Sequence, residues 1–226
     1  MSTAQQSLLY VGDPMCSWCY GFAVPLAAVL DAFPQCPVDL IMGGLRAYNT
    51  QCMDEPLKDS LRHHWAQVHL RSGQPFDADT ILQRSDFVYD TEPACRAVVT
   101  VREHAPACAL DMYEAIAHAF YARGEDVTRT SVLAALWADV RQQAAQPPTL
   151  DDKGFLKAFG SQTIRDTTRE DFELTQRWGV SGFPALFAVV DGQAHAVARG
   201  YTEADDLIAR IEQIFSASAI PDEPVP

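Results

Sequence analysis

Two cysteines, Cys16 and Cys19, stand three positions apart in the segment Cys16-Ser17-Trp18-Cys19. A dithiol with this spacing can exchange disulfides, because one thiolate attacks a substrate disulfide and the second thiol resolves the mixed disulfide. The segment follows a short apolar run and opens a helical pattern, so we expect Cys16 at a helix N-terminus. Unpaired N–H groups and the helix dipole favour a thiolate there. The pattern predicts Cys16 as a partly exposed nucleophile and Cys19 as the resolving thiol buried behind it.

The same cysteine spacing also occurs in pairs of unreactive buried thiols and in zinc sites. Zinc needs two further Cys or His ligands, usually as a second close pair. The other four cysteines are single residues, namely Cys36, Cys52, Cys95 and Cys108. His63-His64 precedes Trp65 in a helical pattern, with Trp65 expected inside and at least one histidine in solvent. We therefore expect no metal, and the sequence assigns no function to the four single cysteines.

Other residues could take part in the reaction or bind its substrate. Asp13 either carries a proton or tunes the thiolates, or it forms an Asp-Pro turn, and the sequence leaves both open. Ser17 and Trp18 are assigned to substrate binding, Trp18 as an apolar rim. Phe183-Pro184 precedes a predicted strand, where a proline removes only a hydrogen bond that the strand does not use. A cis bond there would turn the Phe183 backbone toward the dithiol for pairing with an extended substrate, although base frequencies favour trans.

The elements that position these residues follow from the hydrophobic pattern. Residues 7–12 and 38–42 are predicted strands, and residues 20–33 a helix that Pro25 should kink or delay. A strand, a helix and a strand in so short a span imply a parallel pair with a right-handed crossover. Near the other end, strands 185–190 and 193–199 flank an Asp191-Gly192 turn, and a helix covers 203–216.

Between these two parts the pattern is helical and contains no convincing strand. Thr91 is the expected N-cap of a helix that has Pro93 in its first turn. Further helices are expected at 110–122, 130–144, 152–159 and 162–178. The resulting order, βαβ, helical block and ββα, predicts an α/β fold with one mixed sheet and an all-helical insertion. The boundaries are 7–48 and 179–217 for the core, 49–178 for the insertion, and 218–226 for a disordered tail.

Several segments resemble one known family. Residues 13–22, Asp13-Pro14-Met15-Cys16-Ser17-Trp18-Cys19-Tyr20-Gly21-Phe22, are similar to the active-site signature of the DsbA-like family, in its FrnE-like branch of predicted protein disulfide isomerases. Residues 179–184, Gly179-Val180-Ser181-Gly182-Phe183-Pro184, resemble the cis-proline loop of that family. Two insertion segments, residues 71–76 and 90–96, also resemble stretches of such proteins. The likeness extends over residues 8 to about 216.

This resemblance implies a thioredoxin fold with Cys16 as nucleophile, Cys19 as resolving thiol and a cis bond before Pro184. The chain departs from the family in three ways. Ser17-Trp18 replaces the Pro-His of the periplasmic oxidants, so a strongly oxidising character is not carried over. Ala185 stands where threonine is common after the proline, and the export signal of the best-known relatives is absent.

The composition of the chain limits the kinds of partner that the protein is expected to bind. The net charge of −13 disfavours nucleic acid and anionic membranes, and no apolar run is long enough to span a bilayer. Without a visible export signal we expect a cytoplasmic protein, where close cysteine pairs are catalytic or metal-binding rather than structural.

The predicted function is thiol–disulfide exchange on protein or peptide disulfides. It requires no cofactor beyond a partner thiol such as glutathione or a thioredoxin system. One alternative is a glutathione-dependent transferase or isomerase of the kappa-class type, whose members resemble this insertion architecture but generally have a serine near the position of Cys16. The other is a non-catalytic, chaperone-like binding module.

Overall fold

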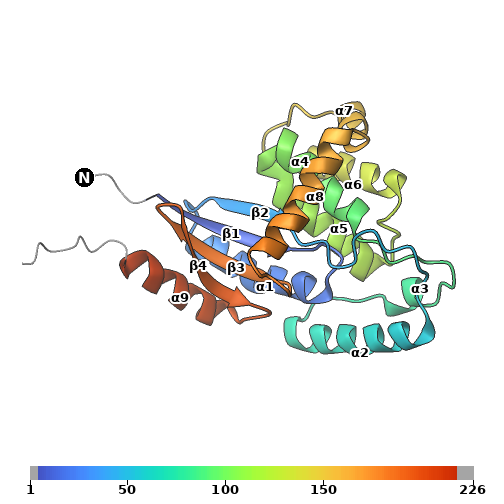
Figure 1. Ribbon diagram of the computed structural model, residues 1–226, viewed down its shortest axis with the longest axis horizontal. Coiled ribbons are helices and arrows are strands. Elements are labelled where there is room, and N and C mark those ends of the chain that lie inside the picture. The colour runs from blue at the N-terminus through green and yellow to red at the C-terminus, as the bar shows by residue number, and fades with distance from the viewer. Residues whose placement is uncertain (1–4, 218–226) are drawn as a thin grey trace, which may run out of the picture.

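A four-stranded mixed sheet joins the first and last parts of the chain (Figure 1). In the computed structural model, which describes residues 5–217, the strand order is β2-β1-β3-β4. Strand β1 (Gln6–Gly12) pairs in parallel with β2 (Val38–Met42) and antiparallel with β3 (Ala185–Val190). Strand β4 (Gln193–Arg199) completes a hairpin with β3. The predicted parallel pair and hairpin are confirmed.

Helices α1 (Ser17–Ala32) and α9 (Ala204–Ala217) lie together on one face of this sheet (Figure 1). Helix α1 begins directly after Cys16, as the position of the dithiol predicted, although the hydrophobic pattern indicated a helix only from residue 20. It continues through Pro25. A proline removes the hydrogen bond to the carbonyl four residues before it, here that of Gly21. Gly21 also allows close packing, because a Cβ at this position would lie 2.6 Å from Cγ1 of Val68 in the next helix.

Seven helices and one short 3₁₀ helix connect β2 to β3. They are α2 (Glu55–Ser72), α3 (Ala78–Leu82), α4 (Glu92–His104), η1 (Pro106–Cys108), α5 (Ala109–Arg123), α6 (Thr130–Gln143), α7 (Asp152–Phe159) and α8 (Gln162–Arg177). Helix α3 and the 3₁₀ helix η1 were not anticipated, because five and three residues are too few to show a period. The predicted fold class, a thioredoxin-like α/β core with a large helical insertion, is confirmed. The predicted tail, 218–226, lies outside the described residues.

A buried ion pair fastens the helical block to the edge of the sheet. Asp171 of α8 accepts hydrogen bonds from the backbone N–H of Met42 at 2.9 Å and from Arg102 of α4 at 2.6 and 3.2 Å. Arg102 also donates to the carbonyl oxygen of Leu40 at 2.7 Å. One carboxylate and one guanidinium thus join β2 to two helices of the insertion.

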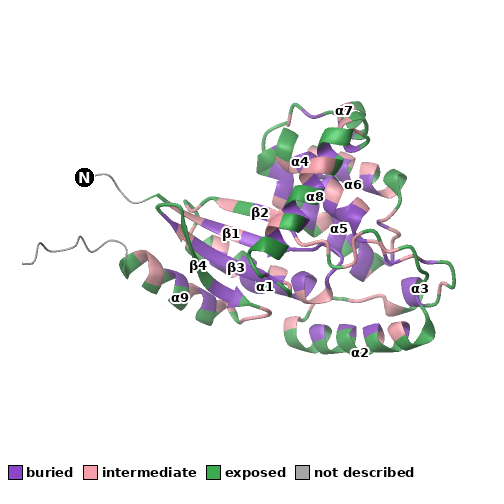
Figure 2. Ribbon diagram, viewed as in Figure 1, coloured by how far each residue is buried: buried purple, intermediate pink, exposed green. Residues whose placement is uncertain are grey.

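An aromatic cluster fills the space between α1, α2 and α5. Tyr20 stacks on Tyr121 at 5.1 Å, and Trp65 meets the same ring edge-on at 5.1 Å. Trp65 is buried while both His63 and His64 are exposed, which confirms the predicted orientation of α2. Figure 2 shows the same division along α2, with a buried stripe facing the rest of the protein and exposed residues on the opposite side. Among the described residues, no helix is long and apolar enough to cross a membrane.

Candidate active site

Cys16 is the N-cap residue of α1. Its backbone N–H donates to the carbonyl oxygen of Asp13 at 2.9 Å, and its own carbonyl accepts from Tyr20 at 3.0 Å, so a turn leads directly into the helix. Cys16 is 6% exposed and Cys19 is fully buried. The predicted order of burial is therefore correct, but Cys16 is more enclosed than expected. The loop at Phe183 lies against it, because the Cys16 thiol donates to the carbonyl oxygen of Phe183 at 3.7 Å.

Cys19 lies one helical turn after Cys16, on the inner side of α1. Burial raises the pKa of the Cys19 thiol well above its usual value, and the hydrogen bond and negative charge of Cys16 raise it further. The thiolate form of Cys19 is therefore less favourable than that of a cysteine exposed to water. Cys16 instead lies at the N-cap of α1 and retains some exposed surface. This asymmetry supports attack by Cys16 followed by resolution through Cys19.

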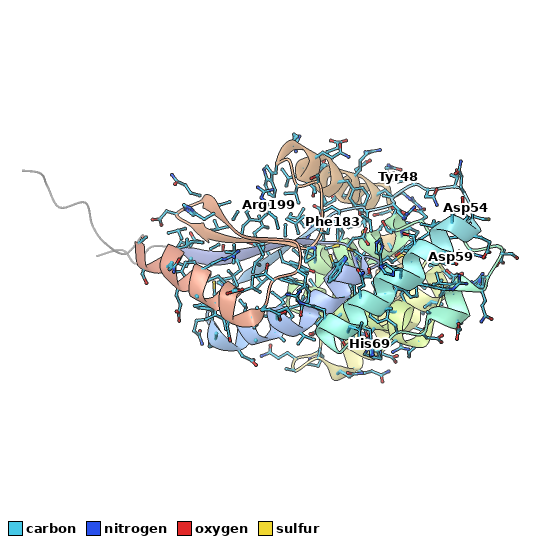
Figure 3. All side chains as sticks on the ribbon, turned by 90° about the horizontal axis from the view of Figure 1, so that it is seen from below. Tyr48, Asp54, Asp59, His69, Phe183 and Arg199 are labelled. Carbon is cyan, nitrogen blue, oxygen red and sulfur yellow. The ribbon has the colours of Figure 1, made fainter. Side chains whose placement is uncertain are left out.

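The loop before β3 faces the dithiol. The peptide bond between Phe183 and Pro184 is cis, as the family resemblance implied. Pro184 is buried and Phe183 half-buried. The Phe183 ring packs over Gly43 so closely that a Cβ at Gly43 would collide with it. In Figure 3, Phe183 lies where the strands meet the helical block. The two segments expected to form the site, far apart in the sequence, are thus in contact.

Asp13 is fully buried beside the dithiol. Its Oδ1 accepts from the backbone N–H of Met15 at 2.8 Å, which closes the predicted turn. Its Oδ2 accepts from Leu45 at 2.7 Å. Burial raises the pKa of Asp13 despite these hydrogen bonds. Its negative charge also contributes to the raised pKa of Cys19. Asp13 is therefore both a structural acceptor and a titratable group near the resolving thiol.

Two residues of the insertion segment 90–96 contact Asp13, and the sequence did not indicate these contacts. Thr91 occupies the predicted N-cap position of α4, but its hydroxyl makes no capping bond there and instead accepts from the backbone N–H of Arg46 at 3.2 Å. The side chains of Thr91 and Cys95 also hydrogen-bond to the Asp13 carboxylate. Cys95 is therefore a buried thiol next to this carboxylate. The only signal for this in the sequence is the resemblance of the segment to the family.

Trp18 and Ser17 occupy the outer side of the first helical turn. Both are half-buried, and the Trp18 ring meets Tyr201 edge-on at 5.8 Å. Arg71, from the other insertion segment that resembles the family, lies over Tyr201 at 5.3 Å and pairs with Glu203 at 2.7 Å. The rim beside the dithiol is thus built jointly by α1, the insertion and the segment before α9.

Two buried tyrosines behind the dithiol were not anticipated. The hydroxyl groups of Tyr10 in β1 and Tyr113 in α5 lie 3.2 Å apart, and the Tyr10 hydroxyl hydrogen-bonds to Cys19. Burial and the charge of Cys19 raise the pKa of both hydroxyls. Their spacing in the sequence indicates only that they are core residues, because periodicity does not show where a hydroxyl group points.

All six cysteines are free thiols in the structure. Cys52 is exposed, Cys36 half-buried, and both Cys95 and Cys108 are buried. Within residues 5–217, no group of three or more His, Cys, Asp or Glu side chains could hold a metal ion.

A family model for the DSBA-like thioredoxin domain matches residues 9–212. The chain belongs to this family. The DsbA-like assignment covers both cysteines, the loop at Pro184 and the entire helical block. No curated protein sequence matches the chain.

Solved structures agree with the DsbA-like assignment. A candidate protein disulfide isomerase from Nitrosomonas europaea is 30% identical, with 94% of this chain and 98% of that one covered and a TM-score of 0.85. The cytosolic disulfide reductase DsbM from Pseudomonas aeruginosa is 26% identical, with 93% and 99% covered and a TM-score of 0.74. A DsbA-type oxidoreductase candidate from Streptomyces coelicolor, 17% identical with 97% and 94% covered and a TM-score of 0.71, shares the fold. Together these findings support a thiol–disulfide oxidoreductase.

Proposed function

We propose that this DsbA-like protein exchanges electrons with protein or peptide disulfides, as a reductase or isomerase, through Cys16 and Cys19. The observation that carries the proposal is the position of the Cys16 thiol, at the N-cap of α1 and 3.7 Å from the carbonyl oxygen of Phe183. An extended substrate lying along the Phe183-Pro184 loop would bring its disulfide next to Cys16. Ser17 and Trp18 would border the same surface and contact that substrate.

The reaction has two exchange steps. The Cys16 thiolate attacks one sulfur of the substrate disulfide, whose S–S bond breaks, and the leaving sulfur takes up a proton. Cys19 then loses its proton and attacks Cys16, which forms the Cys16–Cys19 disulfide and releases the second substrate thiol. The substrate gains two electrons and two protons, and the dithiol loses them. Two molecules of a small thiol, or one protein dithiol, restore the reduced enzyme.

We propose that this resetting thiol is glutathione or a thioredoxin system, in the cytoplasm, with no metal or organic cofactor. The cytosolic reductase from P. aeruginosa has also been solved with GSH, which supports glutathione as a candidate here. The excess of acidic side chains, with a net charge of −13, disfavours nucleic acids and anionic membranes as partners.

Equilibration in glutathione buffers of graded composition tests the proposed function. We expect Cys16 and Cys19 to interconvert between dithiol and disulfide as the buffer becomes more oxidising, read by alkylation and mass spectrometry. The same protein should speed the reduction of insulin disulfides by glutathione. A pair that stays reduced in every buffer, with no effect on insulin, would favour a non-catalytic binding module.

Asp13 is proposed as the charge that tunes Cys19. Replacing it with asparagine, Asp13→Asn, removes a negative charge that raises the pKa of the Cys19 thiol, so that pKa should fall. The β-carbon signals of isotope-labelled cysteine, followed by NMR against pH, measure each thiol separately. Asp39→Asn, at an exposed position of β2, is the matched control. An unchanged or higher pKa of Cys19 in the folded Asp13→Asn variant would contradict this function of Asp13.

A further inference from the structure

A small cavity reaches Cys19, and its lining residues come from α1, α5 and Gln74 rather than from the loop at Phe183. This inner pocket has a volume of about 130 Å³. Its lining residues include Cys19 and Tyr20 of α1, Gln74 after α2, and Tyr113, Glu114 and His118 of α5. Cys19 has no solvent-exposed surface but lines this inner pocket.

The inner pocket adjoins a larger surface depression between α5 and α6. This outer cleft has a volume of about 520 Å³, and Asp111, Arg123 and Asp139 are among its lining residues. Glu114 and His118 line both spaces. They therefore mark the boundary between the buried thiol and bulk solvent.

Hydroxyl groups extend from Cys19 toward this boundary. The Tyr10 hydroxyl contacts Cys19 and lies 3.2 Å from the hydroxyl of Tyr113, which itself lines the inner pocket. A hydroxyl group can accept one proton while it donates another, so two in series can pass a proton along. Tyr113 and Glu114 are adjacent in α5.

The inner pocket has the properties of a hydrated space. Its volume would hold about four water molecules at ~30 Å³ each. Tyr20 is buried, and its hydroxyl is one of the few buried side-chain polar atoms within residues 5–217 that lack a hydrogen-bond partner. Such groups are normally satisfied by protein or water. A water molecule in the inner pocket would satisfy this one and would link Tyr113 to Glu114.

The charges around Glu114 come from two helices. On α5, Asp111 lies one turn before it, and His118 lies one turn after it with Nδ1 3.2 Å from Nη1 of Arg123. On α6, Asp139 lines the same cleft. Partial desolvation, then the negative charge of Asp111, raises the pKa of Glu114. A carboxylate with a raised pKa is a stronger base and still meets solvent on the cleft side.

We propose that Glu114 accepts the proton that Cys19 loses when it resolves the mixed disulfide, through Tyr10, Tyr113 and water in the inner pocket. The proton then passes to solvent in the outer cleft, and in the reverse reaction it returns by the same route. This inference rests on the proposed exchange reaction and assigns to α5 a function in its second step. Asp13 remains a tuning charge, since it is fully enclosed and has no exposed surface through which to release a proton.

The test separates the two exchange steps. Dithiodipyridine is a disulfide whose two halves absorb light when released, the first on attack by Cys16 and the second on attack by Cys19. Replacing Cys52 and Cys36 with serine removes the two more accessible background thiols. Stopped-flow absorbance against pH then gives both rates for the parent, for Glu114→Gln and for Asp139→Asn. The last is the matched control, because Asp139 lines only the outer cleft.

The pH profile of the second step distinguishes a base from a structural residue. With Glu114 as base, the parent rate should be nearly level between the pKa of Glu114 and that of Cys19. In Glu114→Gln only free Cys19 thiolate reacts, so the rate should rise about tenfold per pH unit and meet the parent at high pH. At about pH 6 we expect the variant to be slower by about tenfold or more, with an unchanged first step.

Several outcomes would overturn the inference. It is wrong if Glu114→Gln and Asp139→Asn have the same second-step profile, or if only His118→Gln alters it. It is also wrong if Glu114→Gln slows both steps equally at every pH, which indicates a structural effect. Absence of any exchange in the parent protein would instead contradict the proposed function, so the two failures are distinguishable.

Discussion

Cys19→Ser is expected to accumulate covalent adducts with disulfide-containing proteins in a cell extract, while Cys16→Ser accumulates none. Without Cys19, attack by Cys16 still forms the mixed disulfide, but the fast intramolecular release is lost. Intramolecular reactions have effective concentrations far above those of cellular thiols, so the adducts should persist for at least about a hundredfold longer. Non-reducing electrophoresis with mass spectrometry measures them, and they should disappear when a reductant is added.

The double variant, with serine at both Cys16 and Cys19, is the control for adducts formed by Cys52, the exposed thiol. Adducts of equal amount in Cys16→Ser and Cys19→Ser would contradict the assigned order of attack. A third result would favour the kappa-class alternative: no protein adducts from Cys19→Ser, together with conjugation of glutathione to small electrophiles by the wild-type protein.

Asp171→Ala should lower the free energy of unfolding by about 3 kcal/mol. The substitution leaves the largely buried Arg102 guanidinium without its carboxylate and the N–H of Met42 without its acceptor. Asp171→Asn should lower the free energy of unfolding by a smaller amount, since the side-chain oxygen of asparagine can still accept from the N–H of Met42. Chemical denaturation followed by circular dichroism measures both variants against the wild type.

The matched control for this prediction is Asp59→Ala. Asp59 pairs with Arg62 at 2.7 Å in an exposed turn of α2, where both side chains remain in water. Such exposed pairs contribute about 0–1 kcal/mol, so this variant should unfold almost as the wild type does. If Asp59→Ala lowered the free energy of unfolding as much as Asp171→Ala, the Arg102–Asp171 pair would not be the main attachment of the helical block.

The order of elements could be predicted because each long element has a clear pattern. Strand 38–42 and helix 152–159 have the predicted bounds. The predicted bounds of α1, 20–33 with a kink or a late start at Pro25, were wrong, because the helix begins at Ser17 and continues through Pro25. A single proline does not reveal which neighbour will pack against its turn.

The dithiol could likewise be predicted, whereas its surroundings could not. Cys16 and Cys19 are close in sequence, so a local pattern contains the necessary information. The contacts of Asp13 with Leu45 and Thr91 and of Cys19 with Tyr10 join segments far apart along the chain. Helical or strand periodicity says which residues are buried but not which of them meet.

Asp13 also links the acidity of the Cys19 thiol to the contact between the helical block and the sheet. Its carboxylate joins the end of β1, the segment at Leu45 and the first turn of α4. If the helical block opened locally from the sheet, water would reach this carboxylate and its pKa would return toward that of an exposed aspartate. The electrostatic environment of Cys19 would change in the same event. Partial opening of the block would therefore alter the acidity of the resolving thiol before the strands separate.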